Sequence, residues 1–369
     1  MSDKKESVSE DLLSDSAPVD SGKTITQKIL TTSVSILPWL IVFSLLAAGI
    51  FIKPTAEVEE VIPPAIEKRD MIYGVYRLDF NHLWVAGNYG KILFSDNGGE
   101  VWERQTSSTR NHLQAISAWD NSHVIAVGNG GIVLTSDDGG KNWKEVSSPK
   151  SEIVNKLITV HTYQGGEAWA VGAMGMIISS LDYGKTWKRM REEEDVIMND
   201  MIKVNDSTIV VVGEYGRVFR STDNGKTWKD FYTDSPSSLT AIDFNNAGRG
   251  IAIGLDGVIL ATNDTGESWE FIGSKVSGNT EHLMDVKWSK DLNKWVAVGN
   301  KGKWTKFSVS SSEYETGSFS KTDLSSHTEL TVIDGGLITV GDNVGFYDMQ
   351  TNTWKSLSKV RLSSERLNK

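Results

Sequence analysis

The sequence predicts an all-β fold, a seven-bladed β-propeller with four-stranded blades, preceded by a single transmembrane helix. Three observations support this prediction. An uncharged apolar stretch lies near residue 40, a glycine turn recurs every 41–45 residues, and a Trp-containing motif recurs in register with that turn. The period is that of one four-stranded propeller blade. The composition agrees, because 34 Gly and 13 Trp with only 7 Pro suit short strands joined by tight turns.

The charge balance and the lack of cysteine exclude several classes of function. Acidic residues number 48 against 38 basic ones, and the pI is near 5.2. This balance argues against a surface for nucleic acid or anionic lipid, since phosphate binding depends on clustered Lys and Arg. There is no Cys, which excludes disulfides, thiolate metal sites, Cys nucleophiles and an acylated lipoprotein anchor.

The first folded element is expected to be a transmembrane helix over residues 29–52. These 24 residues carry no charge, and a helix of that length crosses a hydrocarbon core of ~30 Å with some tilt. Pro38 should kink the helix or mark the end of an interfacial turn. A cleaved signal peptide is the alternative, because Ala47, Ala48 and Gly49 offer small residues for cleavage.

The flanking residues predict the orientation of the chain. Lysines are more frequent before the span than after it, which favours a cytoplasmic N-terminus and a propeller on the far side, in the periplasm of a bacterial inner membrane. Residues 1–28 are rich in Ser, Asp and Glu and are expected to be a disordered cytoplasmic tail. Residues 53–70, with Pro63 and Pro64, predict a stiff linker. The propeller follows over 71–358, with a C-terminal tail over 359–369.

Two small residues suggest that the helix also contacts another helix. Ser44 and Ala48 stand four apart and therefore share one helical face. Small residues at this spacing allow close approach of a second helix, and a Ser hydroxyl can bond across the contact. The alternative is that Ser and Ala are common in any membrane span.

Each blade is expected to contain four strands, named A to D, with a Gly-x-x-Gly hairpin between B and C. Paired glycines suit the positive φ angles of tight hairpins. Six units keep this spacing, and the seventh has its second glycine, Gly345, one place late. The first glycines of the seven turns are Gly87, Gly128, Gly172, Gly213, Gly254, Gly299 and Gly341.

The C–D turns carry a second motif, Ser/Thr-x-Asp-x-Gly-x-x-Trp, in the first five units. Its residues are Ser95, Asn97 and Trp102; Ser136, Asp138 and Trp143; Ser180, Asp182 and Trp187; Ser221, Asp223 and Trp228; and Thr262, Asp264 and Trp269. Asn97 replaces Asp in the first. The sixth unit lacks the motif and has Trp304 on its C strand, and the seventh keeps only Trp354.

These motifs resemble Asp boxes, or BNR repeats, which occur in sialidases and in the seven-bladed photosystem II stability and assembly factor family. The period and the Gly-x-x-Gly turn before each box resemble the second family more closely, over about 290 residues. The resemblance implies a propeller and an assembly role. It is a strong indication of fold and a weak one of function.

We expect the boxes to be structural. The Ser/Thr and Asp side chains can bond to amides of the turn, Gly can occupy its left-handed corner, and Trp can cover the seam between neighbouring sheets. A calcium or sugar site is the alternative. No unit has the run of oxygen ligands closed by a bidentate Glu that a calcium loop requires.

The sequence predicts no enzyme, cofactor or metal site. An Arg-Ile-Pro motif of the sialidase kind, HxH or HExxH spacing, a Gly-x-Ser-x-Gly elbow and a phosphate loop are all missing. The acidic run over 192–195 could be a carboxylate site, but a solvated connector between strands D and A is favoured. A glycan-binding or degenerate sialidase-like hydrolytic propeller remains the alternative function.

The predicted contact surface is the face formed by the B–C turns, where apolar and aromatic side chains stand at hairpin tips. Scattered exposed apolar residues are the ordinary alternative. The residues assigned to this face are Tyr89, Asn129, Met174, Tyr215, Leu255 and Lys301. In the photosynthetic relatives the presumed contact is a basic patch, but on the C strands that lead into the boxes here only Arg217 and Arg220 are basic.

The expected role is therefore that of a membrane-anchored scaffold, assembly or accessory subunit of an integral-membrane protein complex. The missing basic patch and the membrane helix both argue against a photosystem partner. A transporter of the RND type is the first partner to consider. No nucleic acid and no small-molecule substrate are expected.

Overall fold

The computed structural model describes residues 25–51, 64–273, 281–309 and 314–358, with side chains in the first range from residue 33 to residue 50. The chain forms two units, Met1–Val61 and Ile62–Lys369. The predicted tails 1–28 and 359–369 fall outside the described residues, except for the start of the helix.

The first unit contains one helix, α1 (Ile25–Phe51), which begins before the predicted residue 29 and continues through Pro38 as one element. Its Ser33–Ile50 segment is long and apolar enough to cross a membrane. The large side chains of this segment, such as Trp39 and Phe43, are exposed within the chain. An exposed apolar surface on a helix of this length is suited to lipid.

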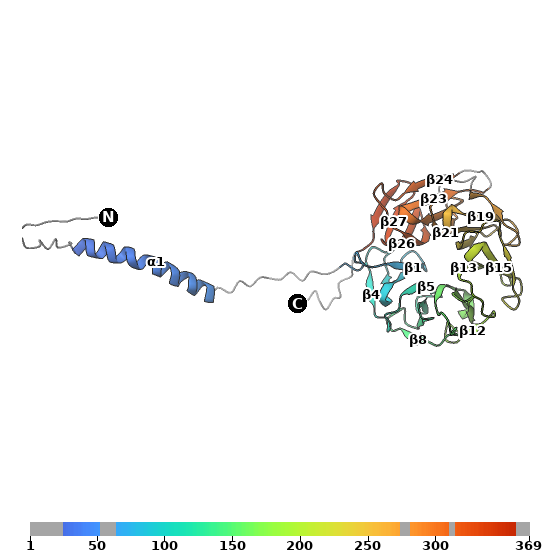
Figure 1. Ribbon diagram of the computed structural model, residues 1–369, viewed down its shortest axis with the longest axis horizontal. Helices are drawn as coiled ribbons and strands as arrows, with labels where there is room; N and C mark the ends of the chain where they lie inside the picture. The colour runs from blue at the N-terminus through green and yellow to red at the C-terminus, as the bar shows by residue number, and fades with distance from the viewer. Residues whose placement is uncertain (1–24, 52–63, 274–280, 310–313, 359–369) are drawn as a thin grey trace, which may run out of the picture. The chain divides into compact units, whose positions relative to one another are not determined.

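The second unit is the predicted seven-bladed propeller (Figure 1). Blades one to four contain β1 (Ile72–Arg77), β2 (Leu83–Gly87), β3 (Ile92–Ser95) and β4 (Glu103–Gln105); β5 (Leu113–Ala118), β6 (Val124–Gly128), β7 (Val133–Ser136) and β8 (Lys144–Val146); β9 (Leu157–Thr162), β10 (Ala168–Gly172), β11 (Ile177–Ser180) and β12 (Lys188–Arg189); and β13 (Met198–Lys203), β14 (Ile209–Gly213), β15 (Arg217–Ser221) and β16 (Lys229–Tyr232).

Blades five to seven follow the same order. They contain β17 (Leu239–Phe244), β18 (Gly250–Gly254), β19 (Ile259–Thr262) and β20 (Glu270–Phe271); β21 (Leu283–Ser289), β22 (Lys294–Gly299), β23 (Lys303–Phe307) and β24 (Tyr314–Ser318); and β25 (His327–Ile333), β26 (Gly336–Gly341), β27 (Gly345–Asp348) and β28 (Thr353–Ser356). The B strands β2, β6 and β10 are buried along their whole length and do not alternate, because neighbouring blades cover both of their faces.

Every blade is built from four consecutive antiparallel strands, and none of the described strands is shared between blades. The ring therefore closes by packing the last blade against the first. The Glu329 carboxylate accepts a hydrogen bond from the Val75 amide at 2.7 Å, and the Thr328 hydroxyl donates to the Ile72 carbonyl at 3.1 Å. Strand A of the last blade thus holds strand A of the first.

Residues 64–70, predicted to be part of a linker, pack against this closure. Ala65 is fully buried, Ile66 nearly so, and the Ala65 amide donates to the Ser358 carbonyl at 3.1 Å. Both side chains belong to the apolar cluster between the first and last blades. The predicted spacer over 53–70 therefore does not extend to residue 70 as a free segment, and its part up to residue 63 lies outside the described residues.

Seven apolar clusters fill the seven seams between blades. The Trp of each box packs against the preceding blade, and Trp102 reaches the last blade. Trp102 is fully buried and Trp143 is 8% exposed, whereas Trp187, Trp228 and Trp269 are only partly buried. At the seam between blades six and seven, Trp354, the part of the motif that blade seven keeps, is partly buried. Trp304 packs in the same seam beside Tyr347, with ring centroids 5.7 Å apart.

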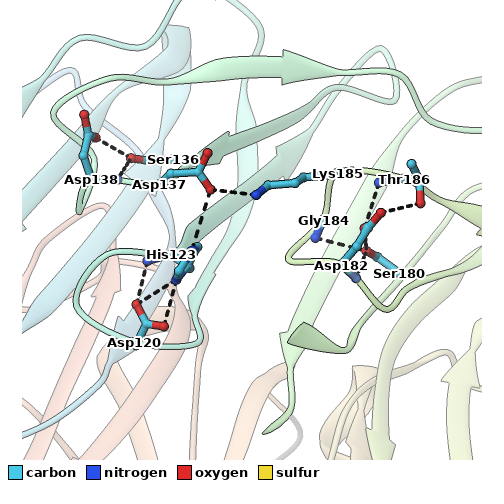
Figure 2. Close-up of polar contacts among 10 residues, drawn as sticks. All are labelled: Asp120, His123, Ser136, Asp137, Asp138, Ser180, Asp182, Gly184, Lys185 and Thr186. Atoms are coloured by element: carbon cyan, nitrogen blue, oxygen red, sulfur yellow. Dashed lines mark hydrogen bonds and ion pairs between the residues drawn. The ribbon is translucent and has the colours of Figure 1, made fainter. Parts of the chain in front are cut away.

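The box turns have the hydrogen bonds that the motif suggests. In the third blade the Ser180 hydroxyl donates to the Asp182 carboxylate at 2.8 Å and accepts from the Gly184 amide at 3.0 Å (Figure 2). The same carboxylate accepts from the Thr186 amide at 2.9 Å and the Thr186 hydroxyl at 2.6 Å. Equivalent bonds occur at Ser95 and Asn97, Ser136 and Asp138, Ser221 and Asp223, and Thr262 and Asp264.

These hydrogen bonds favour the ionised form of the box carboxylates. Bonds from the Asn142 side chain and amide hold the pKa of Asp138 at about 2, and bonds from the Thr227 hydroxyl and amide hold that of Asp223 at about 2. Each carboxylate is therefore charged at neutral pH and acts as the acceptor on which the turn is built.

Replacing Trp102 with Ala should lower the free energy of unfolding of the full chain by about 3–5 kcal/mol, the range for deleting a buried aromatic side chain. Trp102 also donates its indole N–H to the Leu357 carbonyl at 3.0 Å across the closure seam. Trp187→Ala is the matched control, since Trp187 is partly buried and bonds within its own turn to Gly184. Urea denaturation followed by circular dichroism should show a clearly smaller loss for the control, and equal losses would contradict this account.

Acid should weaken the second box over a defined pH range. The folded-state pKa of Asp138, about 2, lies below its ordinary value of 3.8. Its contribution to stability is therefore present above the unfolded-state pKa and is lost as the pH falls toward 2. The difference in Tm between the native chain and Asp138→Asn should shrink between about pH 4 and pH 2, because Asn does not titrate. A difference that stays constant over this range would show that the ionised form is not favoured.

Candidate functional site

The B–C turns form one face of the propeller, and their geometry explains the Gly-x-x-Gly pattern. Gly87 has an extended backbone with φ −159°, and a Cβ there would lie 2.3 Å from the Met71 carbonyl oxygen. The first glycine is therefore required by close approach of strand A, and the prediction that it supplies a positive φ is wrong. Gly90 has φ +71°, and a Cβ there would lie 2.1 Å from the Thr109 carbonyl oxygen.

In the first six B–C turns the residue before the second glycine is the outer corner of the turn and adopts the left-handed conformation. Glycine adopts this conformation freely, and Asn and Asp do so more easily than other L-residues, for which it costs roughly 1–2 kcal/mol. In the first six blades this position holds Tyr89, Gly130, Met174, Tyr215, Asp256 and Lys301. Two large aromatic residues are thus kept in a strained backbone where Gly would be easier to accommodate. The Tyr89 and Tyr215 side chains are 71% and 63% exposed.

The other residues assigned to this face from the sequence differ in placement. Asn129 and Leu255 occupy the first middle position of their turns and are partly buried. Met174 stands at the corner position, but it is only 8% exposed, so the expectation that it projects into solvent is wrong. The connector before the fourth blade covers this turn, with the Gly175 amide donating to the Val196 carbonyl at 2.7 Å. Lys301 is exposed and pairs with Glu281 at 2.9 Å.

The D–A connectors lie beside the B–C turns and add further exposed apolar side chains. The backbone of Asn129 pairs with that of Lys156, and the Gly302 amide donates to the Ser325 carbonyl at 2.8 Å. We call this surface the tip face and define it by Tyr89, Ile153, Val154, Tyr215 and Leu324, all of which are exposed. The opposite face, formed by the A–B and C–D turns, exposes Phe80 and Leu181.

The acidic run over 192–195 anchors the tip face to blade four. Glu194 pairs with Arg191 and, at 2.6 Å, with Arg217, whose guanidinium also pairs with Asp230. Hydrogen bonds from Arg217 lower the pKa of Glu194. Glu193 accepts a hydrogen bond from the Ser151 hydroxyl at 2.6 Å. The interpretation of this run as a solvated connector is thus incomplete, because Glu193 bonds to the neighbouring connector at Ser151 and Glu194 bonds to strand β15 at Arg217.

The A strands line a central channel that contains a cavity of about 320 Å³. Strand A is the inner edge of every blade, so its free amides need acceptors. Carboxylates of the preceding blade supply them at four junctions. The pairs are Asp200 with Ile242 at 3.0 Å, Asp243 with Trp288 at 2.6 Å, Asp285 with Leu330 at 2.8 Å, and Glu329 with Val75 at 2.7 Å.

The channel brings ionisable groups together around the partly buried Lys287. Lys287 pairs with Asp285 at 2.9 Å, and His161 lies 3.1 Å from Asp200. Burial raises the pKa of Asp243 to about 6 and that of Glu329 to about 8. These carboxylates already accept backbone amides, so their first role is to join blades. Within the described residues no group of three or more His, Asp or Glu is placed to hold a metal ion.

Two family models match parts of the chain. Residues 102–196 match that of the photosynthesis system II assembly factor YCF48, which covers blades two and three and the Trp of the first box. Residues 175–333 match that of sortilin, neurotensin receptor 3. No curated protein matches the chain.

Solved structures share the fold at low sequence identity. YCF48 bound to a D1 peptide is 18% identical with a TM-score of 0.61, over 74% of this chain and 90% of that chain. YCF48 from Cyanidioschyzon merolae is 15% identical with a TM-score of 0.61, over 76% of this chain and 96% of that one. An ancestral GH74 enzyme is 13% identical with a TM-score of 0.59, over 77% of this chain and 46% of that chain.

These likenesses agree with the blade count, the four-stranded sheets and the repeated turns described above. Structural similarity at such identity shows the fold, while the family match over 102–196 adds the assembly-factor type of repeat. The chain is a YCF48-like seven-bladed propeller of the BNR-repeat type.

Proposed function

We propose that this chain is a non-enzymatic scaffold or assembly subunit that holds an integral-membrane protein on its tip face. The observation that carries the proposal is the pair Tyr89 and Tyr215, both largely exposed and both in a left-handed backbone. Tyrosine is enriched at the centres of protein interfaces because its rigid ring adds contact area at low entropic cost. Strained residues retained at one surface are typical of functional sites.

Two further features support a protein partner. The exposed apolar residues Ile153, Val154 and Leu324 belong to the same face as the two tyrosines. The similar propeller YCF48 has been solved with a D1 peptide bound. We propose a transporter complex, such as one of the RND type, as the first partner to test, since the acidic balance and the near absence of a basic patch argue against the photosystem contact.

We also propose that α1 spans a bacterial inner membrane with its N-terminus in the cytoplasm and the propeller in the periplasm. The helix is long and apolar enough for this, and lysines precede it. Ser44 and Ala48 would form a docking face for a helix of the partner. In that case the anchor recognises the partner as well as raising the local concentration of the propeller.

Photo-crosslinking should locate the partner on the tip face. A photoreactive phenylalanine analogue placed at residue 89 or 215 should crosslink the same integral-membrane protein in living cells. The analogue at Phe80 is the control, because Phe80 is 68% exposed on the opposite face. Crosslinks of equal yield from residue 80, or none from residues 89 and 215, would contradict the proposed surface.

The same experiment tests the helix. A photoreactive residue at Ser44 should crosslink the partner, and one at Leu46 on another side of α1 should give less product, because residues two apart point to different sides of a helix. Equal yields from residues 44 and 46, with tip-face crosslinks intact, would mean that the helix is only an anchor.

The orientation can be measured because the chain has no Cys. Single substitutions Ser9→Cys in the N-terminal tail and Ser207→Cys at an exposed turn of blade four introduce one thiol each. A membrane-impermeant maleimide added to intact spheroplasts should label residue 207 and spare residue 9, with both labelled after lysis. Labelling of residue 9 alone in intact spheroplasts would show that the chain has the opposite orientation.

A further inference from the structure

A second cavity lies on the face opposite the tip face, where the A–B turns of blades two and three meet. It has a volume of about 480 Å³ and is lined by Tyr76, Trp119, Tyr163 and Tyr183 together with the polar residues Asp120 and Gln164. The four aromatic side chains are partly buried. Each of them therefore packs into the fold and still leaves part of its surface accessible.

The aromatic residues come from positions that are not aromatic in most other blades. Tyr183 stands between the Asp and Gly of the third box, where the other boxes have Gly98, Gly139, Asn224 and Thr265. All five positions have positive φ, and Tyr183 is the largest side chain held there, with φ +61°. Tyr183 thus shares with Tyr89 and Tyr215 of the tip face a left-handed backbone conformation that is unfavourable for a large side chain.

Neighbouring contacts hold these rings as walls of the cavity. The Tyr183 ring lies 5.5 Å from that of Trp119 in a T-shaped arrangement and 4.2 Å from that of His123. The Trp119 indole donates to the Glu167 carbonyl at 2.7 Å, and the Tyr163 hydroxyl accepts from the Lys203 amide at 2.9 Å. The walls are therefore preorganised for a ligand.

The charges around the cavity are nearly balanced. His123 bonds to Asp120 at 2.8 Å, and Asp137 lies between His123 and Lys185, at 3.8 and 3.5 Å (Figure 2). On the other side Lys203 pairs with Glu167 at 2.7 Å. No Lys or Arg is among the residues that line the cavity. A sialic acid or another anion would lack a counter-charge there, and the Asp120 carboxylate already has a partner in His123.

We propose that this cavity binds a neutral saccharide of one or two rings. Aromatic rings suit the apolar faces of a sugar, and the Asp120 carboxylate and the Gln164 amide can bond to its hydroxyl groups. Ligand sites of this kind combine apolar walls with a few polar groups that fix orientation. The site is independent of the proposed protein contact, because it lies on the opposite face from Tyr89 and Tyr215.

Binding can be measured on the full chain in a detergent without a sugar headgroup. Maltose, cellobiose and N,N′-diacetylchitobiose serve as probes, with saturation-transfer NMR and titration of Trp fluorescence as readouts. At least one of these disaccharides should bind saturably. Tyr183→Asn should weaken binding about tenfold or more, since one aromatic contact is worth about that factor. Asn occupies the same position at residue 224, so the fold should keep its Tm.

Tyr215→Asn is the matched control, because it removes a Tyr from the same backbone conformation on the tip face. This variant should keep saccharide binding and lose the protein partner, whereas Tyr183→Asn should do the reverse. The proposal is overturned if none of the three disaccharides binds, if both variants lose binding equally, or if choline or a polyproline hexapeptide binds at this cavity in place of the sugars.

Discussion

The structure depends on the burial of sheet faces at the seams between blades. A four-stranded blade cannot cover its own apolar faces, so each one needs a neighbour on both sides, and the ring must close for the first and last blades to have theirs. Closure is achieved without a shared strand. Trp102, Ala65 and the Glu329 carboxylate all cross from one end of the propeller to the other.

The same constraint explains why carboxylates line the channel. The inner edge of a sheet exposes amide groups that no further strand of the sheet is there to bind. Asp200, Asp285 and Glu329 each reach forward to the next blade and accept one of these amides. Groups that would suggest acid–base chemistry in a sequence therefore have a structural use in this fold. The raised pKa of Glu329 follows from that burial.

Repetition is the reason why the fold could be predicted from the sequence. A 41–45 residue period, the paired glycines and the box motif each report local geometry, and the structure contains seven blades of the expected kind. Exposure depends on non-local packing and was predicted less well. Met174 is buried by a connector, and Ala65 is held by the far end of the propeller. The residues around Met174 and Ala65 in the sequence do not show which distant segment covers them.

The aromatic cavity was missed for a related reason. Its residues come from three blades, and although Trp119 and Tyr163 occupy equivalent positions, Tyr76 and Tyr183 do not, so no single spacing connects all four aromatic residues. One sign was available, since Tyr183 occupies a box position that has Gly in two of the other boxes. A departure from the repeat at a strained position is more informative about binding than the repeat itself. The similar propellers share the repeat at 15–18% identity, which leaves their surfaces free to differ.

The point where the chain enters the propeller has a mechanical consequence. Residues 64–66 lie in the closure seam, where the Ala65 amide is bonded to the Ser358 carbonyl and Arg104 donates to the Pro64 carbonyl at 3.0 Å. Any pull transmitted along the preceding segment therefore acts first on the contacts that close the ring. If the preceding segment entered at a middle blade, a pull would act on the seam of that blade and leave the contacts between the first and last blades intact. Tension along the chain and opening of the ring therefore act on the same set of bonds.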